Sequence, residues 1–120
     1  MDYATVAYNA SSGAHVWTRR YNGLGNGSDL ANAIGVSPDG QEVFVTGEST
    51  GSTTSLDYAT LGYNAATGAH VWTRRYNGPG DGSDIANALA VSSDGTHVIV
   101  TGESSGSTSG TDWATIAYAA

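Results

Sequence analysis

Short stretches in which polar and apolar residues alternate follow one another along the whole chain, separated by clusters of Gly, Ser, Asn and Asp. Alternation with a period of two residues places successive side chains on opposite faces of a strand. No stretch shows the longer period of an amphipathic helix. The pattern therefore predicts an all-β chain. Strands are expected at residues 3–9, 15–21, 30–36, 43–47, 58–64, 70–76, 85–91, 98–102 and 113–119.

Turn and loop signals separate these strands. Ser37-Pro38-Asp39-Gly40 and Ser92-Ser93-Asp94-Gly95 predict tight turns, with the glycine suited to a positive φ. The glycine-rich runs 22–28 and 49–55 predict loops. Tight glycine turns favour antiparallel hairpins over the parallel coils of a β-solenoid, which is the main alternative fold.

The whole pattern repeats every 55 residues. Residues 2–56 and 57–111 form two units that are identical at 38 of 55 positions, and residues 112–120 repeat the first strand once more. Each unit supplies four short strands, which is typical of one blade of a β-propeller. Residues 1–120 are therefore expected to form a two-blade propeller segment with one duplicated strand.

Two motifs support this interpretation. Residues 64–72, Asn-Ala-Ala-Thr-Gly-Ala-His-Val-Trp, resemble the tryptophan-docking motif of quinoprotein-like (PQQ-type) propeller repeats, with residues 9–17 as a counterpart. Residues 36–40 and 90–102 are similar to the inner hairpin of many propeller families, WD40-like ones included. If strands are lettered A to D from the innermost outwards, the resemblance implies the permuted order C-D, A-B-C-D, A-B-C. Only the middle blade, at about residues 29–78, is then contiguous.

The resemblance implies a role for the tryptophans, and alternation along the strands predicts one for the arginines. Trp17 and Trp72, and Trp113 on the duplicated strand, are expected to dock between blades, whereas a lectin would expose such aromatics beside Asp and Asn. One arginine of each pair on the outermost strand is expected to turn to the blade interface and find a carboxylate or carbonyl oxygens. Along the innermost strand, alternation predicts a large face and a small face: Leu30, Ile34 and Val36 against Ala31, Ala33 and Gly35.

A quinoprotein-like activity would require a quinone cofactor, a divalent cation and a catalytic aspartate, and the sequence supplies no residues for them. We therefore expect neither an enzyme nor a cofactor or metal. The weak ligand candidates are Asn32 and Asn87, which interrupt the apolar innermost strand, and Asp29 and Asp84, which follow glycine-rich loops. The two aspartates lack a calcium loop's bidentate glutamate, which favours bonding to backbone amides at a strand start.

Charge narrows the choice of partners. The net charge is −7, lysine is absent and arginine occurs four times, so nucleic acids and anionic membranes are disfavoured as partners. The chain contains no cysteine and no apolar run of the roughly 20 residues that a membrane span needs. No secretory signal follows Met1, which leaves open a cytoplasmic protein or a piece of an exported parent.

Two blades would each leave one face in water, and stacked repeats usually need three or more units. Propellers have 4–8 blades, so the missing blades are expected from other copies in a head-to-tail homo-oligomer. A trimer gives six blades and a tetramer eight. The resemblance favours the tetramer, because quinoprotein-like propellers often have eight. The expected function is a self-assembling scaffold, whether engineered or fragmentary. The alternatives are a multivalent lectin-like or surface-binding module and an open filament.

The duplicated strand predicts a clasp between copies. Its N-terminal version carries Tyr3, Val6 and Tyr8, and its C-terminal version carries Ile116 and Tyr118 with Trp113 in place of the tyrosine. Both compete for one slot at each junction. The short turn at residues 11–13 lowers the closure entropy of the N-terminal version and favours it, whereas the larger Trp113 favours the other.

Overall fold

The computed structural model describes residues 1–120 and consists of strands, turns and loops without a helix, so the all-β prediction is confirmed. No helix long and apolar enough to cross a membrane is present. Each of the nine predicted strands is found: β1 (Tyr3–Tyr8), β2 (His15–Tyr21), β3 (Asp29–Val36), β4 (Glu42–Thr50), β5 (Leu56–Asn64), β6 (His70–Tyr76), β7 (Ile85–Val91), β8 (His97–Ser105) and β9 (Thr111–Ala119).

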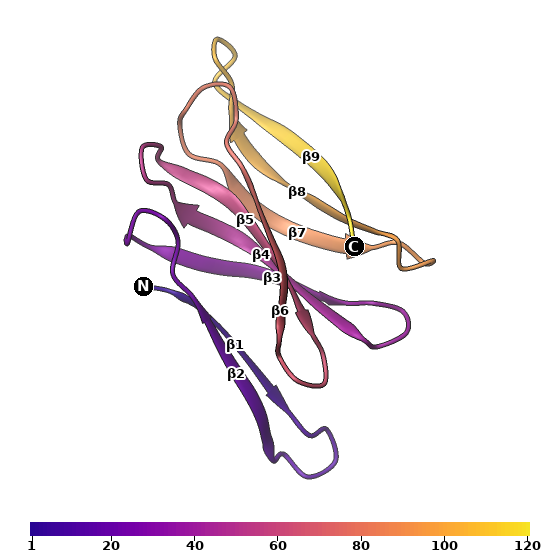
Figure 1. Cartoon of the computed structure of the whole chain (residues 1–120). Helices are drawn as coiled ribbons and strands as arrows, with labels where there is room; N and C mark the ends of the chain where they lie inside the picture. The colour runs from indigo at the N-terminus through magenta and orange to yellow at the C-terminus, as the bar shows by residue number, and fades with distance from the viewer.

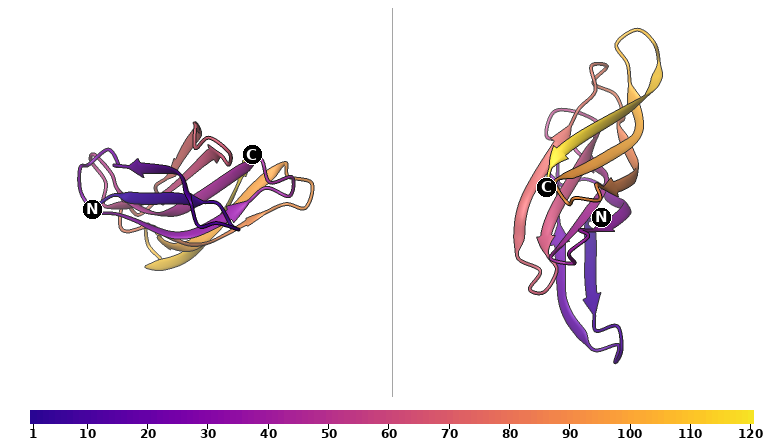
Figure 2. Two further views of the ribbon diagram at one scale, coloured as in Figure 1. Left: turned by 90° about the horizontal axis from the view of Figure 1, so that it is seen from below. Right: turned by 90° about the vertical axis from the view of Figure 1, so that its right-hand side faces the viewer.

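The strands form three antiparallel sheets. The N-terminal sheet contains β1 and β2, the central sheet runs β3-β4-β5-β6, and the C-terminal sheet runs β7-β8-β9. The predicted grouping into two, four and three strands is therefore confirmed. Figure 1 shows the sheets stacked face to face, and Figure 2 shows the β1–β2 and β8–β9 hairpins projecting at opposite ends of an elongated molecule of 50 × 32 × 20 Å.

The core lies between the sheets, because each face of the central sheet packs against a neighbouring sheet. Direct partners across antiparallel strands share a face, and this register divides the central sheet's large side chains into two clusters. One cluster packs against the N-terminal sheet and contains Tyr3, Val45, Ala59, Leu61 and Tyr63. The other packs against the C-terminal sheet and contains Phe44, Tyr58, Ala86, Val98 and Val100, with Trp72 against it.

The predicted large and small faces of the innermost strand hold for residues 33–36, but Leu30 and Ala31 lie on the opposite faces from those predicted. The register between β3 and β4 shifts between Ala31 and Ala33, so Asn32 is an extra, bulged residue. A bulge reverses the alternation of side chains beyond it. Leu30 consequently shares a face with Gly35, and Ile34 lies on the other face. Strand β7 carries the same shift between Ala86 and Ala88.

The turn predictions hold, but one loop is shorter than expected. Gly40 and Gly95 both have a φ of +73°, as the tight-turn signals require. Residues 49–55 were expected to be a loop throughout, yet Ser49 and Thr50 still pair with β5. Ser49 is buried, and its hydroxyl donates to Asp29. This buried hydrogen bond holds in a strand two residues whose local sequence favours a loop.

The packing between the central and C-terminal sheets predicts that truncating Phe44 destabilises the protein far more than truncating the exposed Val71. Phe44 is 0% exposed and stacks on Trp72 at 5.7 Å between ring centroids. Phe44→Ala should lower the free energy of unfolding by about 3–5 kcal/mol, because it leaves a cavity between two sheets. Val71→Ala is the control, since Val71 is exposed on β6, and should change it by less than about 0.5 kcal/mol. Urea titration measures both, and equal effects would contradict this placement of the core.

Candidate assembly interface

The same hydrogen bonds join the sheets at both boundaries. The Tyr3 hydroxyl donates to the carbonyl oxygen of Ala59 at 3.1 Å, and 55 residues later the Tyr58 hydroxyl donates to that of Ala114 at 3.1 Å. The amide of Asp29 donates to Met1 O at 2.7 Å, and the equivalent amide of Asp84 donates to Leu56 O at 2.6 Å. These two hydrogen bonds of the first boundary are therefore repeated at the second.

Burial keeps these tyrosines in their donor form. It raises the pKa of Tyr58 to about 12, with Asp84 and Tyr76 adding to the shift. Burial likewise raises the pKa of Tyr3 far above its ordinary value, with Tyr21 and Asp29 contributing. A neutral phenol that donates to a carbonyl oxygen is thus the stable state of both side chains.

Trp17 lies between the N-terminal and central sheets. Its side chain is buried, and its indole Nε1 donates to Ala65 O at 2.8 Å in the β5–β6 turn. Arg19 donates to Gly68 O at 2.6 Å in the same turn. Gly68 has a φ of +71°, and a Cβ there would approach the Trp17 ring at 2.7 Å. Trp17, Arg19 and the turn thus form a docking contact between the two sheets.

Trp72 is the repeat equivalent of Trp17, but its docking contact is incomplete. Its ring is half-buried between Phe44 and Tyr118, at 5.7 and 6.1 Å between centroids. Its Nε1 is buried without a hydrogen-bond acceptor. Arg74, equivalent to Arg19, donates only to the neighbouring Thr73 O. The C-terminal sheet ends at β9, so this boundary has no turn equivalent to the β5–β6 turn that Trp17 contacts.

Arg75 connects four strands at the first boundary. Its guanidinium donates to the Tyr21 hydroxyl at 2.9 Å, to Ser49 Oγ at 2.7 Å and to Asp57 Oδ2 at 3.0 Å. Ser49 in turn donates to Asp29. Burial alone would lower the pKa of Arg75, but the hydrogen bonds to Asp57 and Tyr21 outweigh it and raise the pKa. This confirms the prediction that one arginine of the pair turns to the interface.

The equivalent Arg20 in the N-terminal sheet has a much poorer environment. It pairs only with Asp2, at 3.2 Å, and its side chain is 68% exposed. The N-terminal sheet contains no strands equivalent to β3 and β4, and β4 supplies the serine that binds Arg75. Arg20 therefore keeps the equivalent of Asp57, which is Asp2, but lacks counterparts of the tyrosine and serine that bind Arg75.

The two aspartates proposed as weak ligand candidates, Asp29 and Asp84, are buried. Asp29 accepts a hydrogen bond from the Gly23 amide at 2.9 Å, and Asp84 accepts from the Gly78 amide at 2.8 Å. Both carboxylates are fully buried. No group of three or more His, Cys, Asp or Glu side chains is placed to hold a metal ion. Asp29 and Asp84 thus anchor glycine-rich loops at the start of β3 and just before β7.

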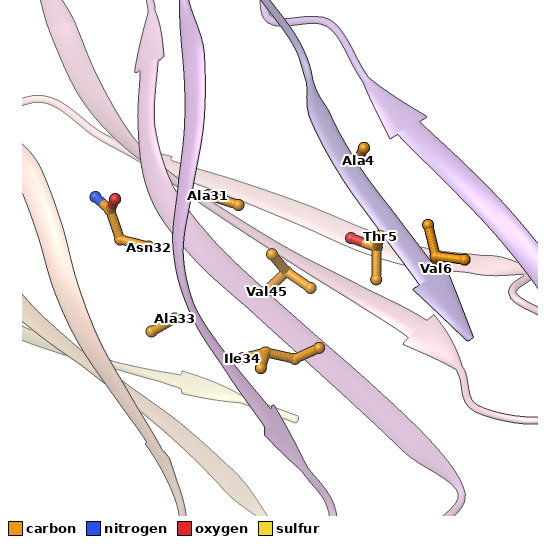
Figure 3. Close-up of a pocket in the computed structure, with 8 residues that line it drawn as sticks. All are labelled: Ala4, Thr5, Val6, Ala31, Asn32, Ala33, Ile34 and Val45. Atoms are coloured by element: carbon orange, nitrogen blue, oxygen red, sulfur yellow. The ribbon is translucent and has the colours of Figure 1, made fainter. Parts of the chain in front are cut away.

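The asparagine candidates lie at the two bulges. Asn32 turns from β1 towards β7 (Figure 3), where its Nδ2 donates to Ala86 O at 2.9 Å. The equivalent Asn87 is exposed and lines a hollow of about 320 Å³ with Trp113. The cross-sheet hydrogen bond of Asn32 was not predicted from the sequence. An asparagine recurring inside an apolar strand was the signal that could have indicated a bulge.

The two ends of the stack expose faces that are covered in the middle. Tyr58 and Phe44 are 0% exposed on the central sheet, whereas their equivalents on the C-terminal sheet, Trp113 and Ile99, are 89% and 37% exposed. At the opposite end, a hollow of about 340 Å³ lies between β1 and β3. Thr5, Val6, Ile34 and Val45 are among the residues that line it (Figure 3).

The residues of the predicted clasp differ in burial. Tyr3 is buried against the central sheet, whereas Val6 and Tyr8 on the same strand are exposed. Ile116 and Tyr118 on β9 pack against the core of the second boundary. Trp113 makes no docking contact within the chain and is the most exposed large apolar side chain. Both duplicated strands are therefore present at once, each at a different end of the stack.

No protein-family model matches this chain, and a search of curated proteins finds no matching protein either.

The buried tyrosines predict how stability depends on alkaline pH. A folded-state pKa above the ordinary value of 10 means that the contribution of Tyr58 is complete below pH 10 and is lost as the pH rises towards 12. Tyr58→Phe should therefore reduce the loss of stability in this range. The urea midpoint, measured as a function of pH, checks this. Tyr8→Phe is the control, because Tyr8 is exposed. A pH dependence unchanged by Tyr58→Phe would contradict the assignment.

Proposed function

We propose that this chain is a self-assembling unit that joins head to tail with further copies of itself, forming a closed ring of four-stranded sheets with the architecture of a β-propeller. The observation that carries the proposal is the mismatch between repeat-equivalent faces. The face of the C-terminal sheet that exposes Trp113 and Ile99 is equivalent to the central-sheet face on which Tyr58 and Phe44 are 0% exposed. Assembly would give it an equivalent cover.

The two ends of the chain complement each other. The N-terminal sheet has the strands equivalent to β5 and β6 and lacks those equivalent to β3 and β4. The C-terminal sheet has the strands equivalent to β3, β4 and β5 and lacks the one equivalent to β6. Joined, they supply every strand of a four-stranded sheet, with one strand in excess. The hollow between β1 and β3 lies where the two missing inner strands would pack.

Complementary ends that are not self-complementary produce a head-to-tail contact, which yields a ring if the rotation closes and a filament if it does not. Because each chain contributes two sheets, the number of blades must be even. A trimer would have six blades and a tetramer eight, and the resemblance to quinoprotein-like repeats favours eight. The role proposed here is that of a scaffold and includes no catalytic step.

A second candidate, a carbohydrate-binding module, is favoured by one observation. Trp113 is exposed beside Asn87, Thr101 and Glu103 around a hollow of about 320 Å³. An exposed indole next to polar side chains can stack on a sugar ring while the polar groups bind its hydroxyls. A glycan array on the purified protein tests this candidate. Glycan binding that Trp113→Ala removes would support it, and an array without binding would rule it out.

Native mass spectrometry at micromolar concentration tests the proposed assembly. We expect a single closed species, a tetramer, with no species growing as the concentration rises. A trimer would keep the ring and change the blade number. Species of unlimited mass that lengthen with concentration would indicate a filament built from the same contacts. A stable monomer would contradict the proposed function.

A further inference from the structure

We propose that at each junction the β1–β2 hairpin of one copy pairs with β8 of its neighbour and takes the place of β9. On this proposal, which rests on the proposed ring, β9 is a built-in competitor that occupies the docking edge of the free chain. The interface is then a hybrid sheet of β7 and β8 from one copy with β1 and β2 from the next. Three features of the structure favour β1 over β9 in that slot, and a fourth favours the head-to-tail contact itself.

The first feature is the unpaired indole of Trp72. Trp17 donates to Ala65 O, and the residue equivalent to Ala65 in the first unit is Ala10, in the β1–β2 turn. A neighbour's hairpin in the slot of β9 brings that turn opposite Trp72 and supplies the missing acceptor. Its Gly13 O would likewise serve Arg74, as Gly68 O serves Arg19. Strand β9 carries no such turn, and the Trp72 Nε1 remains without an acceptor beside it.

The second feature is charge. Asp84 is 0% exposed, and in the chain it accepts only from backbone amides, whereas the equivalent Asp29 reaches the Arg75 guanidinium through Ser49. A neighbour's hairpin would place its Arg20 beside Ser104, the equivalent of Ser49. It would give the C-terminal sheet a cation near its buried carboxylate. Arg20 would keep its pairing with Asp2, which would become largely buried, as the equivalent Arg75–Asp57 pair is.

The third feature is the position at which β1 has Tyr3 and β9 has Trp113. Tyr3 and Tyr58 each fill a buried site and donate a hydroxyl to the next sheet. With β1 in the slot, Tyr3 keeps its bond to Ala59 of its own chain. With β9 in the slot, β1 must be displaced from its place against the central sheet. Trp113 must then occupy the buried site that Tyr3 fills. The indole is larger and has no hydroxyl group, so β1 is the better occupant.

The fourth feature is the size of the facing side chains. Within the chain, the Leu89 side chain lies over Gly35. A Cβ added at Gly35 would lie only 2.6 Å from Leu89 Cδ2. At the junction the equivalent pair is Ile34 with Ala90 of the neighbour, in which both positions are changed. Ile34 is 62% exposed and Ala90 is also exposed in the free chain. Isoleucine thus replaces leucine on one side of the junction, and alanine replaces glycine on the other. Both residues stay uncovered until a second copy docks.

The competition follows from what β9 does in the free chain. It pairs with β8 along its whole length, from His97 opposite Ala119 to Ser105 opposite Thr111. Its Ala114 carbonyl also accepts from Tyr58. A neighbour's β1 would replace this acceptor by the equivalent Ala4 carbonyl. Docking therefore exchanges one strand for another, and β9 must leave before the hairpin can dock.

Two cysteine pairs distinguish the occupants of the slot, and the chain has no cysteine of its own. Thr101 faces Thr115 across β8 and β9 with the hydroxyl oxygens 2.9 Å apart, as Thr46 faces Thr60 in the central sheet. The equivalent residue of β1 is Thr5. Thr5→Cys with Thr101→Cys can form a disulfide only between chains if β1 fills the slot. Thr101→Cys with Thr115→Cys is the matched variant, which locks β9 in place within one chain.

We expect the Thr5/Thr101 pair to yield covalent multimers up to the size of the ring on a denaturing gel, reversed by reductant. The oxidised Thr101/Thr115 pair should remain monomeric in native mass spectrometry and assemble once reduced. Deletion of residues 112–120 should leave the number of copies in the ring unchanged and shorten the half-time of assembly several-fold. Circular dichroism confirms that each variant retains its strands.

Rings that persist in the oxidised Thr101/Thr115 variant, with no covalent multimers from the Thr5/Thr101 pair, would show that β9 keeps the slot. That result overturns the strand exchange and leaves the proposed ring intact. A wild-type chain that is monomeric in native mass spectrometry overturns the ring and the exchange together, so the two failures are distinguishable.

Discussion

The hydrogen bond from a buried tyrosine hydroxyl to a main-chain carbonyl of the next sheet sets the spacing on which the rest of the stack depends. Tyr3 makes it at the first boundary and Tyr58 at the second. The partner is a backbone atom in the middle of a strand, so the bond fixes the position of one sheet along the other. Because the bond is buried, leaving either group unpaired would cost about 1–3 kcal/mol. The apolar clusters form around this fixed point.

Few charged side chains are buried, and the largely buried pair of Arg75 and Asp57 lies at a boundary between sheets. At the first boundary Arg75 satisfies a tyrosine, a serine and a carboxylate from neighbouring strands. Removing one partner of such a buried group is expensive, because the remaining charge is left in a poorly solvated site. Positions equivalent to Arg75 are therefore informative. Where the chain supplies the partners, the arginine is buried, and where it does not, as at Arg20, the side chain stays in water.

The sheets at the ends of the stack differ from the central sheet in what covers them more than in sequence. Phe44 and Tyr58 of the central sheet are fully buried, whereas the C-terminal sheet exposes their equivalents, Ile99 and Trp113, and at the other end of the stack β3 exposes Ile34 towards the hollow beside β1. Exposed apolar faces of this kind mark surfaces of association. The proposed head-to-tail ring covers both with the same contacts that the chain already makes internally. The proposed strand exchange then decides which of two equivalent strands makes them.

The sequence by itself determined the nine strands, their grouping into sheets and the equivalence of the two units. These features depend on alternation, on turn residues and on a 55-residue repeat, all of which are local or directly visible. Only the tertiary structure decided which side chains share a face beyond the bulges at Asn32 and Asn87, because one extra residue reverses the alternation without changing the composition of the strand. Only the tertiary structure also showed that Trp17 and Trp72 differ in their hydrogen bonding. Their local sequences are the same, but a hydrogen bond needs an acceptor on a neighbouring sheet, and only Trp17 has one.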